Sequence, residues 1–333
     1  MKYAKIDLHL HLDGSLYLPW AWETAKKRGV VAPDYTFDEY YHFMHRTEFK
    51  SREERMTRFD FPIAVLQTKE DLAAGIYHLI ETLAEKDMYY AEIRFAPQQH
   101  MLQGLTQTEV VEAVLEGRAQ AKKDFPGVET GIINCMMHKG ADAHTNWEAN
   151  LETIRVTKEF LGKGVVALDL AGFENNGDFS LYGPLFEIAK EQGLPYTIHA
   201  GEMGDGSHIP LAISWGASRI GHGIDSVRNP EWLKEVVEKQ IPLEVCVTGN
   251  TIAMYNRKYC DHPVRKLIEA GVKVTLNTDN MTFSETDLIN EYSQMRALGV
   301  SMETLKRCAQ NSIDAAFCDE ETKDRLRKKM GFI

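Results

Sequence analysis

Short runs of apolar residues alternate along the chain with longer stretches that have the periodicity of amphipathic helices. The short runs are nearly continuous in their apolar character, several follow a Gly or Pro, and their lengths favour buried strands. Eight such runs are present: Ala4–His9, Met88–Phe95, Glu129–Met137, Val165–Ala171, Pro195–His199, Arg219–Gly221, Pro242–Val247 and Val272–Asn277. The helical stretches between them include Leu72–Lys86, Gln107–Lys123, Trp147–Phe160, Leu181–Gln192, Pro230–Lys239 and Pro263–Ala270.

Buried strands that alternate with helices are typical of a parallel sheet. Eight strand-and-helix units predict an α/β fold of the (β/α)8 TIM-barrel class. The 333 residues fit one large barrel, since about 250 residues is typical of this fold and insertions are common. A doubly wound open sheet is the alternative, but no Gly-x-Gly-x-x-Gly turn follows the first strand. We therefore expect residues 1–333 to form a single domain.

The connection between the first two strands is much longer than the others. Residues 15–87 make up most of it and are rich in aromatic side chains: Trp20, Trp22, Tyr35, Phe37, Tyr40, Tyr41, Phe43, Phe59 and Phe61. These side chains provide enough apolar surface for a small packed subdomain. We expect a helical insertion that also caps the mouth of the barrel and forms one wall of a pocket.

Charge and composition exclude several classes of partner. The formal net charge is −11, and the basic segment Lys323–Lys329 fits a solvated helix face, so we expect no nucleic-acid binding. No run of about 18 apolar residues is present, which argues against a membrane span. The N-terminal stretch lacks the continuous apolar centre of a signal peptide, and the five cysteines are scattered without a Cys-x-x-Cys motif. We expect a cytoplasmic protein with reduced thiols, either a monomer or a homo-oligomer.

Polar residues stand where several predicted strands end. In a barrel of this class, the C-terminal ends of the strands meet around the active site. His9 and His11 point to the same face of the first strand, His199 ends the fifth strand, and Asp279 follows the eighth. Each residue alone has an ordinary structural explanation, but together three imidazoles and a carboxylate predict a metal site. Such ligands suit Zn²⁺ with one position open to water, and Fe²⁺ or Mn²⁺ would also fit.

Five short motifs resemble those of adenosine deaminases, a family of the metal-dependent amidohydrolase superfamily. They are His-Leu-His-Leu-Asp-Gly (9–14), Leu-Asp-Leu-Ala-Gly (168–172), His-Ala-Gly-Glu (199–202), Gly-His-Gly (221–223) and Leu-Asn-Thr-Asp (276–279). The resemblance runs in order from residue 6 to about residue 320. It implies that His9, His11, His199 and Asp279 bind one zinc ion per chain. The strand Val165–Ala171 lacks the lysine that bridges two metals elsewhere in the superfamily, which indicates a single ion.

The resemblance also implies catalytic roles for three residues. Glu202 would donate a proton to N1 of a purine, Asp279 would accept the proton of the attacking water, and His222 would steady the developing charge. Hydroxide would add to C6, and ammonia would leave. C6 is a poor electrophile until N1 is protonated, so Glu202 needs a raised pKa in a dry pocket.

Four residues would contact the substrate by the same resemblance. Asp13 would bind a ribose hydroxyl, the backbone of Gly172 would meet purine N3, and His11 would lie beside the substrate. Asn280 departs from the family, which usually has an Asp that donates to purine N7. An amide always carries N–H donors, so Asn280 can donate to N7 without taking up a proton, or it marks a changed base.

The resemblance implies a zinc-dependent hydrolase that converts adenosine or 2′-deoxyadenosine to inosine or 2′-deoxyinosine in purine salvage, with a small purine nucleoside as its partner. Alternative substrates for the same chemistry are adenine, an N6-substituted adenine, and another adenine-bearing metabolite such as aminofutalosine. A third interpretation is a binding protein that kept the fold without catalysis. The full set of ligands together with Glu202 and His222 argues against this third interpretation.

Overall fold

A computed structural model describes residues 2–46, 48–49, 52–139, 143–174, 177–202, 205–254 and 258–333. Within these residues, eight parallel strands form two four-stranded sheets in the orders β1-β2-β3-β4 and β5-β6-β7-β8. The strands are β1 (Ile6–His11), β2 (Tyr90–Phe95), β3 (Glu129–His138), β4 (Val165–Gly172), β5 (Thr197–Ala200), β6 (Arg219–His222), β7 (Leu243–Val245) and β8 (Val274–Leu276). Isolated parallel bridges, Leu168 to Tyr196 and Leu10 to Asp279, link the edges of the two sheets. The predicted (β/α)8 class is confirmed.

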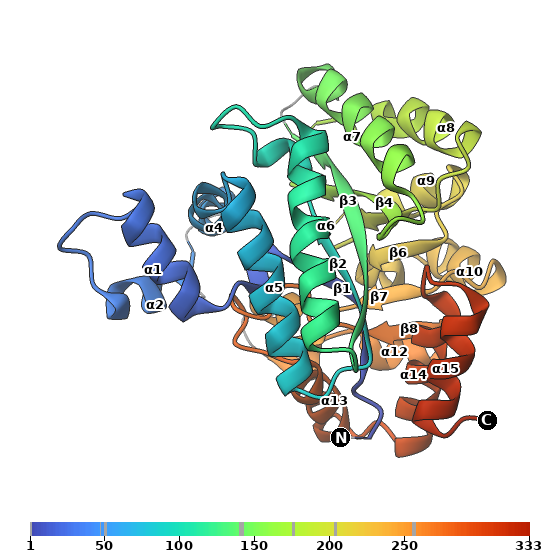
Figure 1. The fold of residues 1–333 in the computed structure, drawn as a ribbon. Helices are drawn as coiled ribbons and strands as arrows, with labels where there is room; N and C mark the ends of the chain where they lie inside the picture. Colours follow the sequence, from blue (N-terminus) through green and yellow to red (C-terminus); the bar gives the residue numbers. More distant parts are fainter. Residues whose placement is uncertain are drawn as a thin grey trace.

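Helices surround the strands, as Figure 1 shows. They are α1 (Leu18–Arg28), α2 (Phe37–Met44), α3 (Arg52–Met56), α4 (Asp60–Val65), α5 (Lys69–Glu85), α6 (Gln107–Asp124), α7 (Trp147–Phe160), α8 (Gly183–Glu191), α9 (His208–Ser214), α10 (Pro230–Glu238), α11 (Val247–Met254), α12 (Val264–Glu269), α13 (Leu288–Ala297), α14 (Met302–Ala315) and α15 (Glu320–Met330). All six predicted helical stretches are present, with ends that differ by a few residues. Among the described residues, no helix combines the length and apolar character needed to span a membrane.

Local sequence signals fix the start of the long helices that cover the first sheet. Thr106 and Glu109 form a reciprocal capping box at the start of α6, in which each side chain accepts from the other residue's backbone N–H. Thr68 caps α5 by accepting from the N–H of Asp71. Such caps satisfy N–H groups that have no partner inside the helix. Both helices then bury one apolar face against the sheet.

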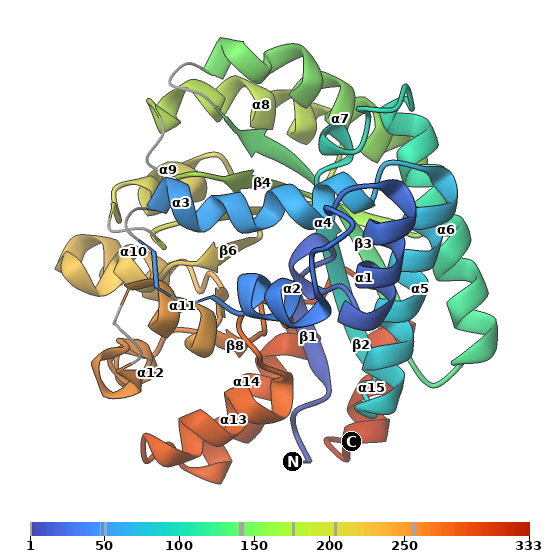
Figure 2. The same cartoon turned by 90° about the vertical axis from the view of Figure 1, so that its left-hand side faces the viewer.

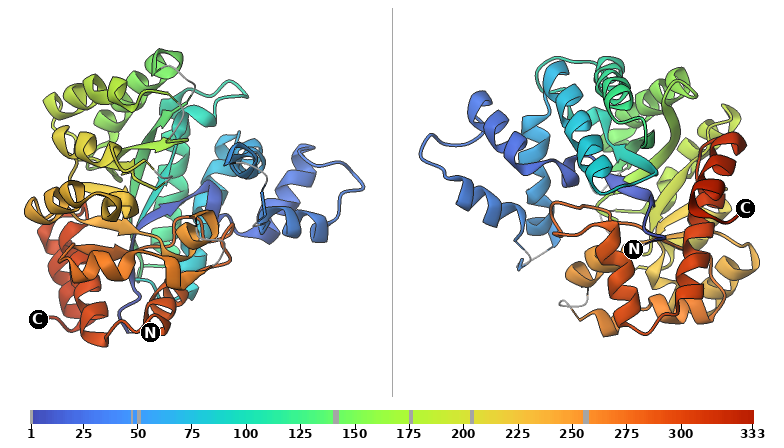
Figure 3. Two further views of the ribbon diagram at one scale, coloured as in Figure 1. Left: turned by 180° about the vertical axis from the view of Figure 1, so that it is seen from behind. Right: turned by 60° about the horizontal axis from the view of Figure 1, so that its bottom comes forward.

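The described residues between β1 and β2 include five helices, α1–α5. In Figure 2, α2, α3 and α4 lie in front of the strands, while Figures 1 and 3 show α1 and α2 projecting from the barrel. Aromatic rings pack these helices together: the Tyr40 ring lies 5.5 Å from that of Trp22 and 4.8 Å from that of Phe61. Aromatic pairs at such distances add packing energy beyond the area that they bury.

One predicted strand is wrong at its C-terminal end. The apolar run Pro242–Val247 was expected to be extended throughout, but β7 ends at Val245 and α11 begins at Val247. The Asn250 N–H donates to the Cys246 carbonyl at 2.9 Å, which is a helical bond. A short apolar run suits a buried helical turn as well as a strand, so periodicity alone does not separate the two.

Candidate active site

The four predicted metal ligands converge at the C-terminal ends of three strands. His9 and His11 end β1, His199 lies on β5, and Asp279 follows β8. The Nε2 atoms of His11 and His199 are 3.3 Å apart. One carboxylate oxygen of Asp279 lies 3.6 Å from Nε2 of His9 and 3.5 Å from Nε2 of His11. The structure therefore gathers the three imidazoles, with the Asp279 carboxylate beside His9 and His11.

Three separations among these atoms suit ligands of a single metal ion. Ligands at about 2.0–2.1 Å from one tetrahedral ion lie roughly 3.3–3.4 Å from one another. The three separations are 3.3, 3.5 and 3.6 Å. The Nε2 atom of His9 is buried without a hydrogen-bond partner among the described residues, as expected of a lone pair that is kept for a metal. Imidazole nitrogens and a carboxylate oxygen are also the ligand types that zinc prefers.

Buried carboxylates on other strands lie beside two of the imidazoles. His9 Nδ1 lies 2.7 Å from Oε2 of Glu244, and His199 Nδ1 lies 2.9 Å from Oδ2 of Asp169. A ring that donates through Nδ1 leaves the lone pair of Nε2 free to bind a metal. Glu244 therefore turns the Nε2 atom of His9 toward the cluster, and Asp169 contacts the His199 ring as an ion pair.

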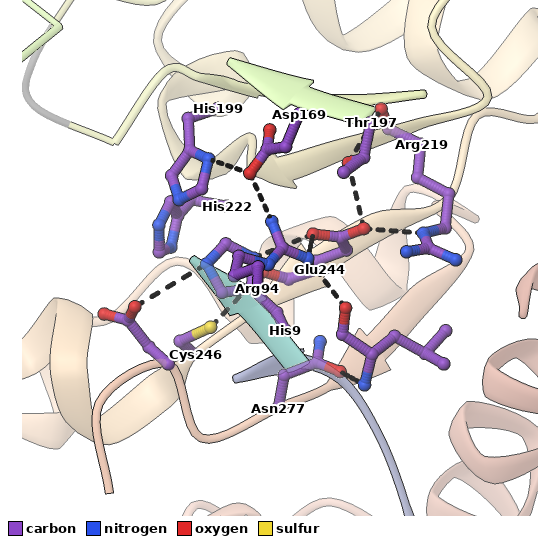
Figure 4. Close-up of polar contacts among 12 residues, drawn as sticks. His9, Arg94, Asp169, Thr197, His199, Arg219, His222, Glu244, Cys246 and Asn277 are labelled. Atoms are coloured by element: carbon purple, nitrogen blue, oxygen red, sulfur yellow. Dashed lines mark hydrogen bonds and ion pairs between the residues drawn. The ribbon is translucent and has the colours of Figure 1, made fainter. Parts of the chain in front are cut away.

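Two buried arginines neutralise these carboxylates, as Figure 4 shows. Arg94 contacts Asp169 and Glu244, each at 2.8 Å, and Arg219 contacts Glu244 and Glu92, each at 2.6 Å. Burial alone would raise the pKa of Glu244, but the charges of Arg94 and Arg219 outweigh it and hold that pKa well below its usual range. Glu244 therefore stays ionised at the centre of the barrel.

This network of buried charges is not among the features predicted from the sequence. A signal was present, because Glu92 and Arg94 stand two apart in an otherwise apolar strand and so share one face. Charged residues inside such a run are almost never fully buried unless they are paired. The partners could not be assigned, since Arg94 pairs with a residue 150 positions away.

Glu202 and His222 lie beside the ligand cluster. Oε2 of Glu202 is 3.7 Å from Nε2 of His222, and ligand atoms of these two residues and Asp279 all lie within 4.8 Å of one another. Burial raises the pKa of Glu202 to about 7; the Arg55 charge opposes this shift and the Asp279 charge adds to it. Glu202 is thus able to carry a proton near neutral pH, as a general acid must.

The hydrogen bonds of His222 indicate which of its nitrogens carries the proton. Nδ2 of Asn250 lies 3.2 Å from Nδ1 of His222, and an amide nitrogen can only donate. Burial lowers the pKa of His222 well below its usual range, so the ring is neutral. Its single proton then sits on Nε2, which faces Glu202. His222 and Asp279 both have left-handed backbone, with φ of 63° and 62°, a strain that concentrates at functional sites.

His9, His222 and Cys246 form another buried set of potential metal ligands, whose ligand atoms lie within 4.8 Å of one another. Only a thiolate binds metal well. Burial raises the pKa of the Cys246 thiol well above its usual range, so the sulfur keeps its proton, and it lies 3.5 Å from the Glu244 carbonyl. Cys246 is therefore a poor metal ligand beside His11, His199 and Asp279.

A cavity of about 370 Å³ opens beside the cluster. Its lining combines His11 and Asp13 with the ends of β2, β3 and β4 and with α3 and α4: Met56, Phe59, Asp60, Ile63, Ala96, Gln99, Cys135, Met137, His138, Lys139, Ala171, Gly172 and Phe173. This volume is within the range of small-molecule sites. Burial raises the pKa of Asp13 to about 6. Of the predicted substrate contacts, His11, Asp13 and Gly172 line this cavity.

Asn280 stands next to Asp279 and packs against Gly14. A Cβ atom at Gly14 would lie 1.7 Å from Oδ1 of Asn280, so only glycine fits there. Asn280 is 7% exposed, and its Oδ1 is buried without a partner among the described residues.

Known proteins resemble this chain over nearly its whole length. The sequence model described as adenosine deaminase matches residues 4–331. An adenosine deaminase of Clostridium perfringens strain 13 is 38% identical over 330 residues, which cover 98% of each chain. The solved structure of an adenine deaminase from Arthrobacter aurescens has a TM-score of 0.87 at 25% identity and 98% coverage of both chains. An Arabidopsis N6-mAMP deaminase has a TM-score of 0.86 at 25% identity, covering 99% of this chain and 98% of its own.

Proposed function

Because the chain belongs to the adenosine deaminase family, we propose that it hydrolyses adenosine and 2′-deoxyadenosine to inosine and 2′-deoxyinosine with release of ammonia. One observation carries the proposal: His9, His11, His199 and Asp279 bring four potential ligand atoms together, with Glu202 within reach of Asp279. The substrate would be a 6-aminopurine nucleoside, and the cofactor one zinc ion.

The roles of the chain's own groups follow from their positions. His9, His11, His199 and Asp279 would hold the ion, which when bound lowers the pKa of its water from about 15.7 to about 7. Glu202 delivers its proton to purine N1, which makes C6 electrophilic. Asp279 takes the proton released by the attacking water. His222 donates from Nε2 to the oxygen that adds at C6.

The cavity supports a substrate larger than a bare base. It extends from His11 to α3 and α4, which leaves room beyond a purine for a sugar. Asp13 would accept from a sugar hydroxyl, and the backbone of Gly172 would meet N3. We also propose that residues 1–333 form a single domain in which the segment 15–87 caps the site, since Met56, Phe59, Asp60 and Ile63 line this cavity.

Asn280 would donate a hydrogen bond from its amide N–H to purine N7. Its Oδ1 packs against Gly14 and has no partner among the described residues, and the N–H end would be the one that meets the substrate. Unlike a carboxylic acid, the amide needs no proton to act as a donor. The fold is shared with an adenine deaminase and an N6-mAMP deaminase at 25% identity, so adenine and N6-methyl-AMP are the competing substrates to compare.

A substrate panel tests the proposal. The zinc-loaded protein is assayed for ammonia release from adenosine, 2′-deoxyadenosine, adenine, N6-methyl-AMP and aminofutalosine. We expect the highest kcat/KM for the two nucleosides and loss of turnover on metal removal, with recovery on zinc addition. Faster turnover of adenine or of an N6-substituted substrate would overturn the nucleoside assignment, and no turnover of any substrate would overturn the catalytic one.

A further inference from the structure

The backbone that carries Glu202 is held by the side chain of a second acidic residue. Glu174 lies two residues after β4 and is 5% exposed. One of its carboxylate oxygens accepts from the Gly201 N–H, and the other accepts from the Glu202 N–H at 3.0 Å. Hydrogen bonds to a charged carboxylate are about twice as strong as neutral ones. A single side chain therefore fixes both peptide groups of the turn after β5.

The Glu174 carboxylate is fixed in turn by His208, the first residue of α9. His208 Nδ1 lies 3.0 Å from Oε1 of Glu174, and His208 is 7% exposed. The imidazole stacks on Phe179, with ring centroids 4.2 Å apart and planes at 14°. Rotating the imidazole away would break both contacts. His208 and Phe179 therefore hold the carboxylate in the orientation that meets the two N–H groups.

The backbone of the turn at Gly201 and Glu202 is tightly constrained. Gly201 has a φ of 70°, in the left-handed region that favours glycine, and a Cβ there would lie 2.5 Å from Cδ1 of Ile209. The backbone thus runs directly against α9. Two buried N–H groups without an acceptor would each cost about 1–3 kcal/mol, so this turn depends on the Glu174 carboxylate.

We propose that Glu174 and His208 are positioning residues, which hold the Glu202 side chain in the place from which it delivers its proton to the substrate. The inference rests on the proposed function, in which Glu202 is the proton donor. Neither side chain is itself a predicted metal ligand, and His199 is held separately by Asp169. We call Glu174 and His208 together the clamp. Substitutions in the clamp should therefore slow the chemical step without weakening metal binding.

Substitutions at both residues test the clamp. In Glu174→Gln the amide has one acceptor oxygen, so it can hold one of the two N–H groups and presents a donor to the other. We expect kcat to fall about 10- to 100-fold, the size of effect seen when a catalytic group is displaced by about 1 Å. KM and zinc content should stay within twofold. His208→Ala should act in the same direction, and His208→Asn, which keeps a donor near Nδ1, should restore most of kcat.

Asp205→Asn is the matched control. The Asp205 carboxylate lies 3.6 Å from the other ring nitrogen of His208, but its side chain is 48% exposed. This variant should keep kcat within twofold. Normal kcat in a folded Glu174→Gln protein, with wild-type melting behaviour, would overturn the proposal. An equal loss of zinc and of kcat would also overturn it, because the residues would then serve the metal site.

Amide hydrogen exchange provides a readout that does not need turnover. Exchange at Gly201 and Glu202 should accelerate at least tenfold in Glu174→Gln and His208→Ala, and remain unchanged in Asp205→Asn. If the wild type deaminates no purine while this pattern holds, the proposed function fails but the clamp on the Glu202 backbone stands. Unchanged exchange in all variants would overturn the clamp itself.

Discussion

Nδ1 of His9 lies 2.7 Å from a carboxylate oxygen of Glu244, and both side chains are fully buried. The pair connects the metal-facing end of β1 to β7, which lies on the other side of β8. The same carboxylate accepts from Arg94, Arg219 and Thr197. One side chain thus orients a predicted metal ligand and pairs with two arginines, whose other partners are Asp169 and Glu92.

Glu244→Gln should weaken zinc binding and destabilise the fold. The amide cannot balance Arg94 and Arg219, and breaking a buried ion pair costs about 3–5 kcal/mol. Loss of the carboxylate behind His9 should reduce zinc affinity about 10- to 100-fold. Chelator competition measures the affinity, and denaturant unfolding measures the stability. Glu269→Gln, at a 66% exposed side chain paired with Arg265, is the control and should change neither quantity. Wild-type zinc affinity in Glu244→Gln would contradict this role.

The strands could be predicted because a parallel barrel buries both faces of each strand and so leaves nearly continuous apolar runs. The end of β7 could not, since Cys246 and Val247 are apolar in either conformation. The spacing of His9 and His11 indicated a shared face, and their rings lie 5.3 Å apart. The roles of these ligands remain predictions.

The positions of Glu174 and His208 were outside the reach of sequence reasoning. Glu174 follows β4 much as Asp279 follows β8, but nothing in the local sequence indicates that its partners are the Gly201 and Glu202 N–H groups and His208. The partners of the buried charges Arg94 and Glu244 could not be predicted either, because the two residues are far apart in the sequence. Local sequence patterns thus predict helices, strands and the ends of strands. They do not predict which side chains of distant elements are in contact.

Glu202→Gln should abolish most of the turnover while leaving the metal bound. The amide cannot donate an acidic proton to purine N1, and general acid catalysis contributes about 10²- to 10⁴-fold. We expect a fall in kcat of that size, with zinc content and nucleoside binding close to wild type. Steady-state kinetics together with metal analysis measure both. Full activity of the zinc-loaded variant would show that another group supplies the proton.

The pH dependence of kcat should show the ionisation of the Glu202 carboxyl group. Burial raises the pKa of Glu202 to about 7, so the acid form is abundant below that pH and is lost as the pH rises through it. A bound cation would favour the ionised form, so the alkaline fall should begin at or below about pH 7. A kcat profile from pH 5 to 9 measures this fall. A profile that is flat to pH 9 would contradict the assignment of Glu202 as the acid.

Asn280→Asp should make substrate binding depend on pH. The two side chains have nearly the same shape, so the carboxyl fits against Gly14, but it can donate to purine N7 only when protonated. Loss of one hydrogen bond costs about 0.5–1.5 kcal/mol, which corresponds to a roughly 2- to 10-fold rise in KM for adenosine as the pH increases. The wild-type KM should stay flat over the same range, because an amide does not titrate. The adenosine analogue with carbon in place of N7 is the control, since it offers no acceptor and both proteins should bind it equally at every pH. Parallel KM profiles for the two proteins on adenosine would show that Asn280 does not contact N7.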